Sequence, residues 1–96
     1  MLSILIPTYN YNTFPLVKEL FNQCQKCKIE YEIIVLDDGS ENNEIKENNL
    51  KINTLSNCSF EVNEFNLGRG PNINKLVSKA KHSWVLIMDC DTFPSG

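Results

Sequence analysis

The sequence predicts an α/β fold in which a mostly parallel β-sheet is flanked by helices. Short apolar runs alternate with helix-like segments along the chain, which is typical of a parallel sheet covered on both faces. The apolar runs are continuous rather than alternating, which also indicates burial on both faces. Because crossovers between parallel strands are right-handed, we expect the strand order 3-2-1-4, counted along the chain.

The first expected strand is the apolar run at residues 2–7, which ends at a proline. Asn12 or Thr13 can cap the helix that follows, and Pro15 is compatible with its first turn. Apolar residues at helical spacing predict one buried face for that helix. These are Val17, Leu20, Phe21 and Cys24.

The second strand is expected in "YEIIVLDDGS", residues 31–40, and the polar stretch 41–49 is compatible with a helix. Residues 60–65 alternate with period two, which suits a strand at or near a sheet edge. Pro71 fits the first position of a third helix, and the last strand is expected at 84–89. The buried stripe of the third helix is expected at Ile73, Leu76, Val77 and Ala80.

Composition limits the classes of protein. The chain has 96 residues, enough for one small domain, and its apolar content of 42% is ordinary for a globular protein. Its net charge of −3, without a Lys/Arg run, argues against nucleic-acid binding. The longest apolar run is too short to span a membrane, and no signal peptide is evident. We expect a cytoplasmic, soluble protein, with a peripheral position on the inner face of the membrane as the alternative.

The cysteines and the single histidine have ordinary interpretations. Cys24 and Cys27 form one C-x-x-C late in a helix, whereas zinc ribbons usually carry two such pairs, so we expect reduced thiols without zinc. His82 follows Lys79 and Lys81 at a helix C-terminus, where the dipole favours positive charge. We interpret His82 as a surface residue rather than a catalyst.

Polar residues follow three of the expected strands. Pro7 and Tyr9 follow the first strand, "DDGS" follows the second, and "DCD" follows the last. Ligands of open parallel sheets bind beyond the carboxyl ends of the strands, so these groups are expected to meet at one edge. The four carboxylates of the two acidic motifs would repel one another there unless a cation joined them. Such an oxygen-rich set suits Mg²⁺ or Mn²⁺.

Each of these features also has a structural explanation. Asp, Gly and Ser favour turns, so "DDGS" alone can be a turn, and "DCD" is short enough to occur by chance. Tyr9 can pack against the core, and Arg69, between two glycines, can be a solvated loop charge. The combination at successive strand ends is more specific than any single member.

The motifs together resemble family 2 glycosyltransferases. The segments that carry the resemblance are "SILIPTYN" at 3–10, "EIIVLDDGS" at 32–40, "NLG" at 66–68 with Asn74 beyond it, and "WVLIMDCD" at 84–91. Their order and approximate spacing match the family over nearly the whole chain. The resemblance implies a GT-A fold, a Rossmann-like sheet that binds nucleotide-diphosphate sugars.

The resemblance also implies roles for single residues. Pro7 and Tyr9 match the segment that lies against the nucleotide base. Asp38 matches the acid that accepts the base N–H, which would favour uracil and therefore a UDP-sugar. Asp37 is expected to fix the turn or to reach the ribose, and Arg69 matches the loop that often carries a basic contact to the donor.

The last motif matches the D-x-D of the family. Asp91 matches its metal-binding acid, and Asp89 is expected to be a ribose-binding or supporting partner in the same metal site. Mn²⁺ or Mg²⁺ held there would bind the diphosphate. The implied acceptor is a sugar or a lipid-linked glycan.

Two departures from the family pattern are visible. Where members often have Ala-Arg-Asn, this chain has Asn72-Ile73-Asn74, so the arginine is absent. Members usually continue past D-x-D into an acceptor-binding half that carries the catalytic base. We therefore expect residues 1–96 to be a single partial GT-A domain, with the base beyond residue 96 and no turnover by the isolated chain. The alternative is a non-catalytic nucleotide-binding fragment or remnant.

Two other families carry similar acidic motifs. In the D-x-D-x-T of haloacid-dehalogenase-type phosphatases the threonine stands four residues after the first acid, whereas Thr92 stands three after Asp89. Receiver domains carry paired acids after their first strand, whereas Asp37 and Asp38 follow the second. Both motifs fit poorly.

Overall fold

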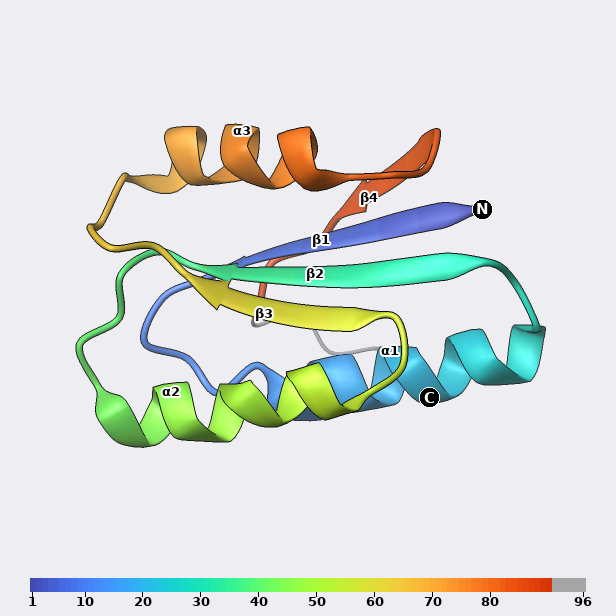
Figure 1. Cartoon of the computed structure of the whole chain (residues 1–96), viewed down its shortest axis with the longest axis horizontal. Helices are drawn as coiled ribbons and strands as arrows, with labels where there is room; N and C mark the ends of the chain where they lie inside the picture. Colours follow the sequence, from blue (N-terminus) through green and yellow to red (C-terminus); the bar gives the residue numbers. More distant parts are fainter. Residues whose placement is uncertain (91–96) are drawn as a thin grey trace.

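A computed structural model describes residues 1–90, and within them the chain forms a four-stranded parallel sheet with helices on both faces (Figure 1). The strand order is β3-β2-β1-β4, which confirms the expected order 3-2-1-4. In chain order the elements are β1 (Leu2–Thr8), α1 (Phe14–Cys27), β2 (Tyr31–Asp37), α2 (Asn43–Leu50), the 3₁₀ turn η1 (Lys51–Thr54), β3 (Cys58–Val62), α3 (Arg69–Lys79) and β4 (Trp84–Ile87).

The register of the sheet brings the strand ends together. β1 and β2 pair along their whole length, from Leu2 opposite Tyr31 to Thr8 opposite Asp37. The backbone pairing continues one residue further, because Asp38 N donates to Thr8 O at 2.9 Å. The polar segments after β1 and β2 therefore leave the sheet at the same edge, as parallel pairing requires.

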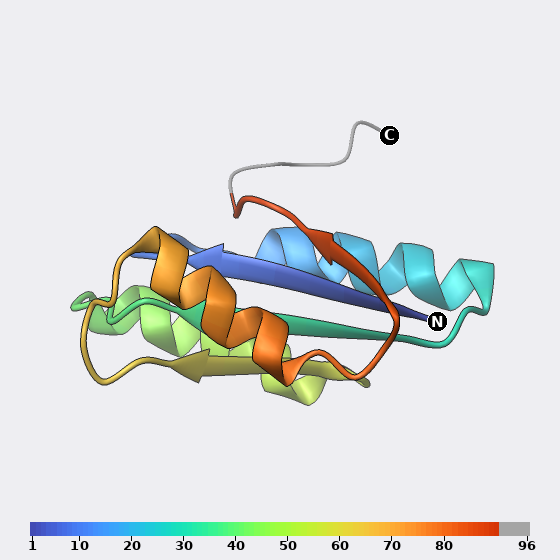
Figure 2. The ribbon, with the colours of Figure 1, turned by 90° about the horizontal axis from the view of Figure 1, so that it is seen from above.

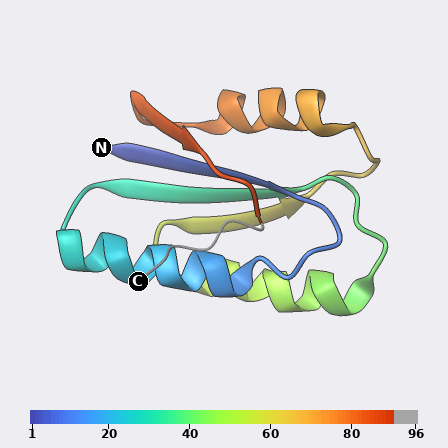
Figure 3. The same ribbon diagram turned by 180° about the vertical axis from the view of Figure 1, so that it is seen from behind.

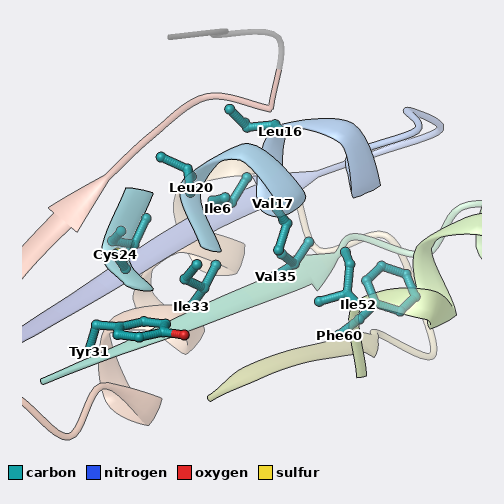
Figure 4. Packing of buried hydrophobic residues seen from close by; sticks show 11 residues of the cluster. Ile6, Leu16, Val17, Leu20, Cys24, Tyr31, Ile33, Val35, Ile52 and Phe60 are labelled. Atoms are coloured by element: carbon teal, nitrogen blue, oxygen red, sulfur yellow. The ribbon is translucent and has the colours of Figure 1, made fainter. Parts of the chain in front are cut away.

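The main core lies between the sheet and α1 (Figure 4). Three of the four residues expected on the buried face of α1 are buried, and Phe21 packs partly buried beside them. These helix residues pack against the sheet residues Ile6, Ile33 and Val35. Ile52 from η1 and Phe60 from β3 extend the same cluster. The buried residues of α1 are Leu16, Val17, Leu20 and Cys24.

A smaller core lies on the opposite face, beneath α3. There Leu76 packs on Leu5, Ile34 and Leu36. The expected stripe on α3 is therefore narrower than predicted, since Val77 is exposed. The helix also begins at Arg69, with Pro71 inside its first turn rather than at its first position.

The start of α1 is capped by a residue that the sequence does not single out. Thr13 occupies the cap position, but its hydroxyl pairs with the Thr8 hydroxyl at 2.8 Å instead of capping the helix. The backbone amides of Thr13 and Phe14 donate to Asn49 Oδ1 at 2.8 and 3.2 Å. The cap thus comes from α2, across the sequence, rather than from Asn12 or Thr13.

The two outer strands differ from expectation in their extent and cover. β3 is an edge strand, as predicted, but it spans Cys58–Val62 rather than residues 60–65. All four residues of β4 are exposed, although burial on both faces was expected. β4 pairs only with β1, and Figures 2 and 3 show it at the side of the sheet, beyond the cover of α3. Within residues 1–90, no helix is both long and apolar enough to cross a membrane.

Candidate functional site

A pocket of about 320 Å³ opens at the carboxyl edge of the sheet, where the segments after β1, β2 and β3 meet. Four residues expected at the site line it together, namely Pro7, Tyr9, Asp38 and Arg69. The remaining lining residues are Thr8, Asn66, Gly68, Asn72 and Cys90.

A second hollow, of about 410 Å³, extends the pocket toward the end of β4. It shares Pro7, Tyr9, Arg69 and Cys90 with the first and adds Tyr11 and Asp89. The two hollows are therefore parts of one continuous surface. Its inner end is at Asp38, and its outer end is at Asp89.

Tyr9 stands at the rim of this surface. Its side chain is 47% exposed, whereas Pro7 beside it is buried. The loop behind it is fixed, because Asn10, in the left-handed region with φ of 49°, donates its N–H to the Ser40 hydroxyl at 2.6 Å. The Tyr9 ring therefore lies at the pocket and is not packed in the core. The alternative interpretation, that Tyr9 packs against the core, is wrong.

Asp38 is buried at the base of the pocket and is held by three donors. Its Oδ1 accepts from Leu67 N at 2.7 Å and from Asn63 Nδ2 at 3.1 Å. Its Oδ2 accepts from Gly68 N at 2.9 Å. The carboxylate therefore fastens the loop between β3 and α3 to the end of β2, and it reaches the pocket from a fixed position.

Gly39 makes this arrangement possible. Its φ of +80° lies in the left-handed region, and a Cβ there would approach Asn66 N to 2.8 Å. The peptide between Phe65 and Asn66 occupies the space that a side chain would need. A glycine after Asp38 is thus required for the close approach of the loop that donates to the Asp38 carboxylate.

Asp37 lies outside the pocket lining and is fully buried. Its Oδ1 accepts from Ser40 N at 2.7 Å, which fixes the turn after β2. Its Oδ2 has no partner within residues 1–90. Of the two expected roles, the turn is observed, and contact of Asp37 with a ribose stays a prediction.

Arg69 and Asp89 form an ion pair at the outer end of the pocket. Arg69 Nη2 donates to Asp89 Oδ1 at 2.6 Å, and the two side chains are 65% and 53% exposed. The pair connects the first residue of α3 to the segment after β4. Asp91, expected as the principal metal ligand, lies outside the described residues.

A buried amide network behind Asp38 was not anticipated. Asn63 Nδ2 donates both to Asp38 and to Asn72 Oδ1, the latter at 2.7 Å. Lys75 Nζ donates to Asn63 Oδ1 at 2.7 Å, and Asn72 Nδ2 donates to Leu36 O at 3.2 Å. The sequence carries no local signal for such a network, because its members come from β2, α3 and the loop between β3 and α3.

The described residues offer a hard cation such as Mg²⁺ only a few protein ligands. Among residues 1–90, no three His, Cys, Asp or Glu side chains are grouped closely enough to hold a metal. Mg²⁺ and Mn²⁺ commonly use one or two carboxylates and take further ligands from water and phosphates. The exposed Asp89 carboxylate fits that role, and the metal would compete with Arg69 for it.

The histidine and the cysteines lie away from the pocket. His82 is at the amino edge of the sheet, where its backbone N–H donates to the Ser3 hydroxyl at 3.1 Å, and its lack of a catalytic role stays a prediction. Cys24 is buried and Cys27 is exposed. Burial raises the pKa of Cys58 to about 12, and it also raises the pKa of Cys24. The absence of zinc at the C-x-x-C stays a prediction.

Several known proteins are similar to this chain in sequence or in fold. A sequence model described as "Glycosyl transferase family 2" matches residues 3–96. An uncharacterized glycosyltransferase of Mycoplasma genitalium is 33% identical over 96 residues, and a chondroitin synthase of Escherichia coli is 34% identical over 95. The crystal structure of residues 1–349 of TarS from S. aureus, in complex with UDP-GlcNAc, superposes with a TM-score of 0.67 at 28% identity.

These relatives are all longer than the matched region. The match covers 94% of this chain and 32% of the Mycoplasma protein, and 98% of this chain and 14% of the chondroitin synthase. For the TarS structure it covers 96% of this chain and 27% of that one. The chain thus spans a third or less of the length of the proteins it matches.

Proposed function

This chain belongs to glycosyltransferase family 2, and we propose that it binds a nucleotide-diphosphate sugar, specifically a UDP-sugar, at the carboxyl edge of its sheet. The observation that carries the proposal is the shared pocket of Pro7, Tyr9, Asp38 and Arg69. These residues come from three separate segments of the chain, and the fold assembles them around one cavity.

The base is proposed to enter the inner part of the pocket. Tyr9 offers an exposed ring on which a base can stack, and Asp38 offers an acceptor for a base N–H. Three of the roughly four lone-pair positions of the Asp38 carboxylate are used by donors within residues 1–90, and the remaining one is on Oδ2. A ring N–H such as that of uracil can donate a hydrogen bond to this remaining lone pair of Asp38.

The diphosphate is proposed to lie over the outer part of the pocket, between Arg69 and Asp89. Arg69 is the first residue of α3, so its guanidinium and the positive end of the helix dipole attract the same anion. Mn²⁺ or Mg²⁺, held by Asp91 and Asp89, would neutralise charge on the diphosphate as it leaves. The Arg69–Asp89 pair would open or rearrange when the anion and the cation bind.

Transfer to an acceptor hydroxyl, on a sugar or a lipid-linked glycan, needs a general base. The carboxylates of Asp38 and Asp89, which line the two hollows, both have other proposed roles: Asp38 binds the nucleobase, and Asp89 helps to hold the metal. We therefore place the base beyond residue 96 and propose that residues 1–96 act as the nucleotide-binding part of the transferase. Because neither of these two carboxylates is available as a general base, a second candidate function is a module that binds the nucleotide without catalysis.

The position of the site can be tested with a ¹⁵N-labelled chain titrated with UDP and Mg²⁺. We expect the largest shifts at the amides of Asn66, Gly68 and Arg69, which line the pocket, and small shifts at Lys81 and His82 on the opposite edge. Shifts concentrated at the amino edge, or no saturable shifts at all, would overturn the proposed site.

A further inference from the structure

We propose that Asn72 is a second base-reading residue, which together with Asp38 selects a base that presents a ring N–H beside a carbonyl oxygen. The inference rests on the proposed function, because it concerns the same pocket. Uracil and guanine present this pair of groups, and cytosine and adenine do not. Asn72 lines the pocket with Asp38.

The orientation of the amide network follows from Lys75. An ammonium group can only donate, so the oxygen of Asn63 must face Lys75 Nζ, which it contacts at 2.7 Å. The nitrogen of Asn63 must then face Asp38 and Asn72. Because that nitrogen donates to Asn72, the oxygen of Asn72 faces Asn63, and its nitrogen faces the carbonyl of Leu36. The Asp38 carboxylate and the Leu36 carbonyl, which can only accept, require the same orientation of the two amides.

This orientation leaves one donor and one acceptor on residues that line the pocket. The two N–H groups of Asn63 are both used, whereas Asn72 Nδ2 has one acceptor within residues 1–90 and one N–H without an acceptor there. Within the same residues Asp38 keeps one lone pair on Oδ2 without a donor. Asn72 Oδ1 and Asp38 Oδ1 accept from the same nitrogen, so the two side chains are close neighbours.

An acceptor next to a donor can bind a nucleobase that presents a donor next to an acceptor. The ring N–H of uracil or guanine can donate to Asp38 Oδ2 while the adjacent carbonyl oxygen accepts from Asn72 Nδ2. In cytosine and adenine the corresponding ring nitrogen carries a lone pair, which would face the carboxylate, and an amino group would face the Asn72 N–H. A buried site that leaves such groups unpaired discriminates strongly against the wrong ligand.

The test compares UDP, GDP, CDP and ADP by calorimetry with the unmodified chain, Asn72→Ala and Ser78→Ala, an exposed α3 residue that serves as control. We expect the unmodified chain to favour UDP or GDP over CDP and ADP. Asn72→Ala should weaken binding of the favoured nucleotide about tenfold and leave CDP and ADP nearly unchanged. Ser78→Ala should leave every affinity unchanged.

A second variant separates recognition from folding. Lys75→Met keeps an aliphatic stem of similar length and removes the contact of the ammonium group with Asn63, while the Asp38 carboxylate and the Leu36 carbonyl still fix the orientation of both amides, so the preference for the favoured base should persist in this variant. An equal loss for all four nucleotides in Asn72→Ala, or an unchanged preference in that variant, would overturn the inference while leaving the proposed function intact. Absence of nucleotide binding by the unmodified chain would overturn both.

Discussion

Arg69 Nη2 lies 2.6 Å from Asp89 Oδ1, which joins the start of α3 to the segment after β4 at the carboxyl edge of the sheet. Both side chains are largely exposed, and exposed ion pairs contribute little to stability. The pair therefore matters chiefly for its position, since it holds one cationic and one anionic group beside the pocket. A diphosphate and a divalent cation carry the complementary charges.

Tyr9→Ala should weaken UDP binding, because the mutation removes the exposed ring proposed to stack on the base. Base–aromatic stacking contributes about 1–3 kcal/mol, so calorimetry should show a loss of at least about fivefold. Tyr9→Phe keeps the ring and should bind nearly as well as the unmodified chain. Equal affinity in Tyr9→Ala would show that the ring does not contact the base.

Asp38→Asn should lower both stability and base discrimination. The new amide nitrogen would face either Gly68 N or the two donors at Oδ1, so at least one donor would be left without an acceptor. An unsatisfied buried donor costs about 1–3 kcal/mol, and denaturant unfolding should report a loss in that range. The preference for UDP over CDP should fall in the same variant, and a variant of unchanged stability and preference would contradict the assigned role of Asp38.

The sequence predicts the parallel sheet and most of the pocket for one physical reason. Parallel strands end at a common edge, so polar residues after successive strands must meet there, as Pro7, Tyr9 and Asp38 do. It does not predict the Asn49 cap or the Asn63–Asn72 network, because side-chain amides find distant partners that no local pattern marks. The exposure of β4 was missed for a related reason, since an apolar strand does not reveal what covers it.

Stability should fall as pH rises from about 9 to about 12. The thiol of Cys58 loses its proton near pH 9 when it is solvated, whereas burial raises its pKa to about 12 in the folded chain. The folded state therefore holds the proton more tightly, and its advantage is lost as pH rises through the folded pKa. Cys58→Ala should make this fall shallower, although Tyr31, whose pKa burial also raises, will retain part of it. Cys27→Ala, at an exposed position, is the matched control, and denaturant unfolding across this range provides the measurement.

The isolated chain should self-associate through β4. Trp84 is 74% exposed, and Val85, Leu86 and Ile87 are also exposed beside an edge that is unpaired within residues 1–90. Such edges pair readily with other strands unless a charge intervenes. Leu86→Lys should shift sedimentation toward the monomer, whereas Gln23→Lys adds the same charge on α1 and should not. A monomer at every concentration in the unmodified chain would contradict this prediction.

We propose that the carboxyl edge of the sheet holds a metal-assisted nucleotide-diphosphate site. The decisive measurement is calorimetric titration of UDP with and without Mn²⁺, using the unmodified chain, Asp91→Asn and Asp89→Asn. We expect saturable binding that Mn²⁺ strengthens by at least about tenfold, and we expect Asp91→Asn to remove most of that enhancement. Asp89→Asn should reduce the enhancement as well, because it also removes a carboxylate from the outer pocket. UDP binding that is independent of Mn²⁺ and unchanged by Asp91→Asn would contradict the account.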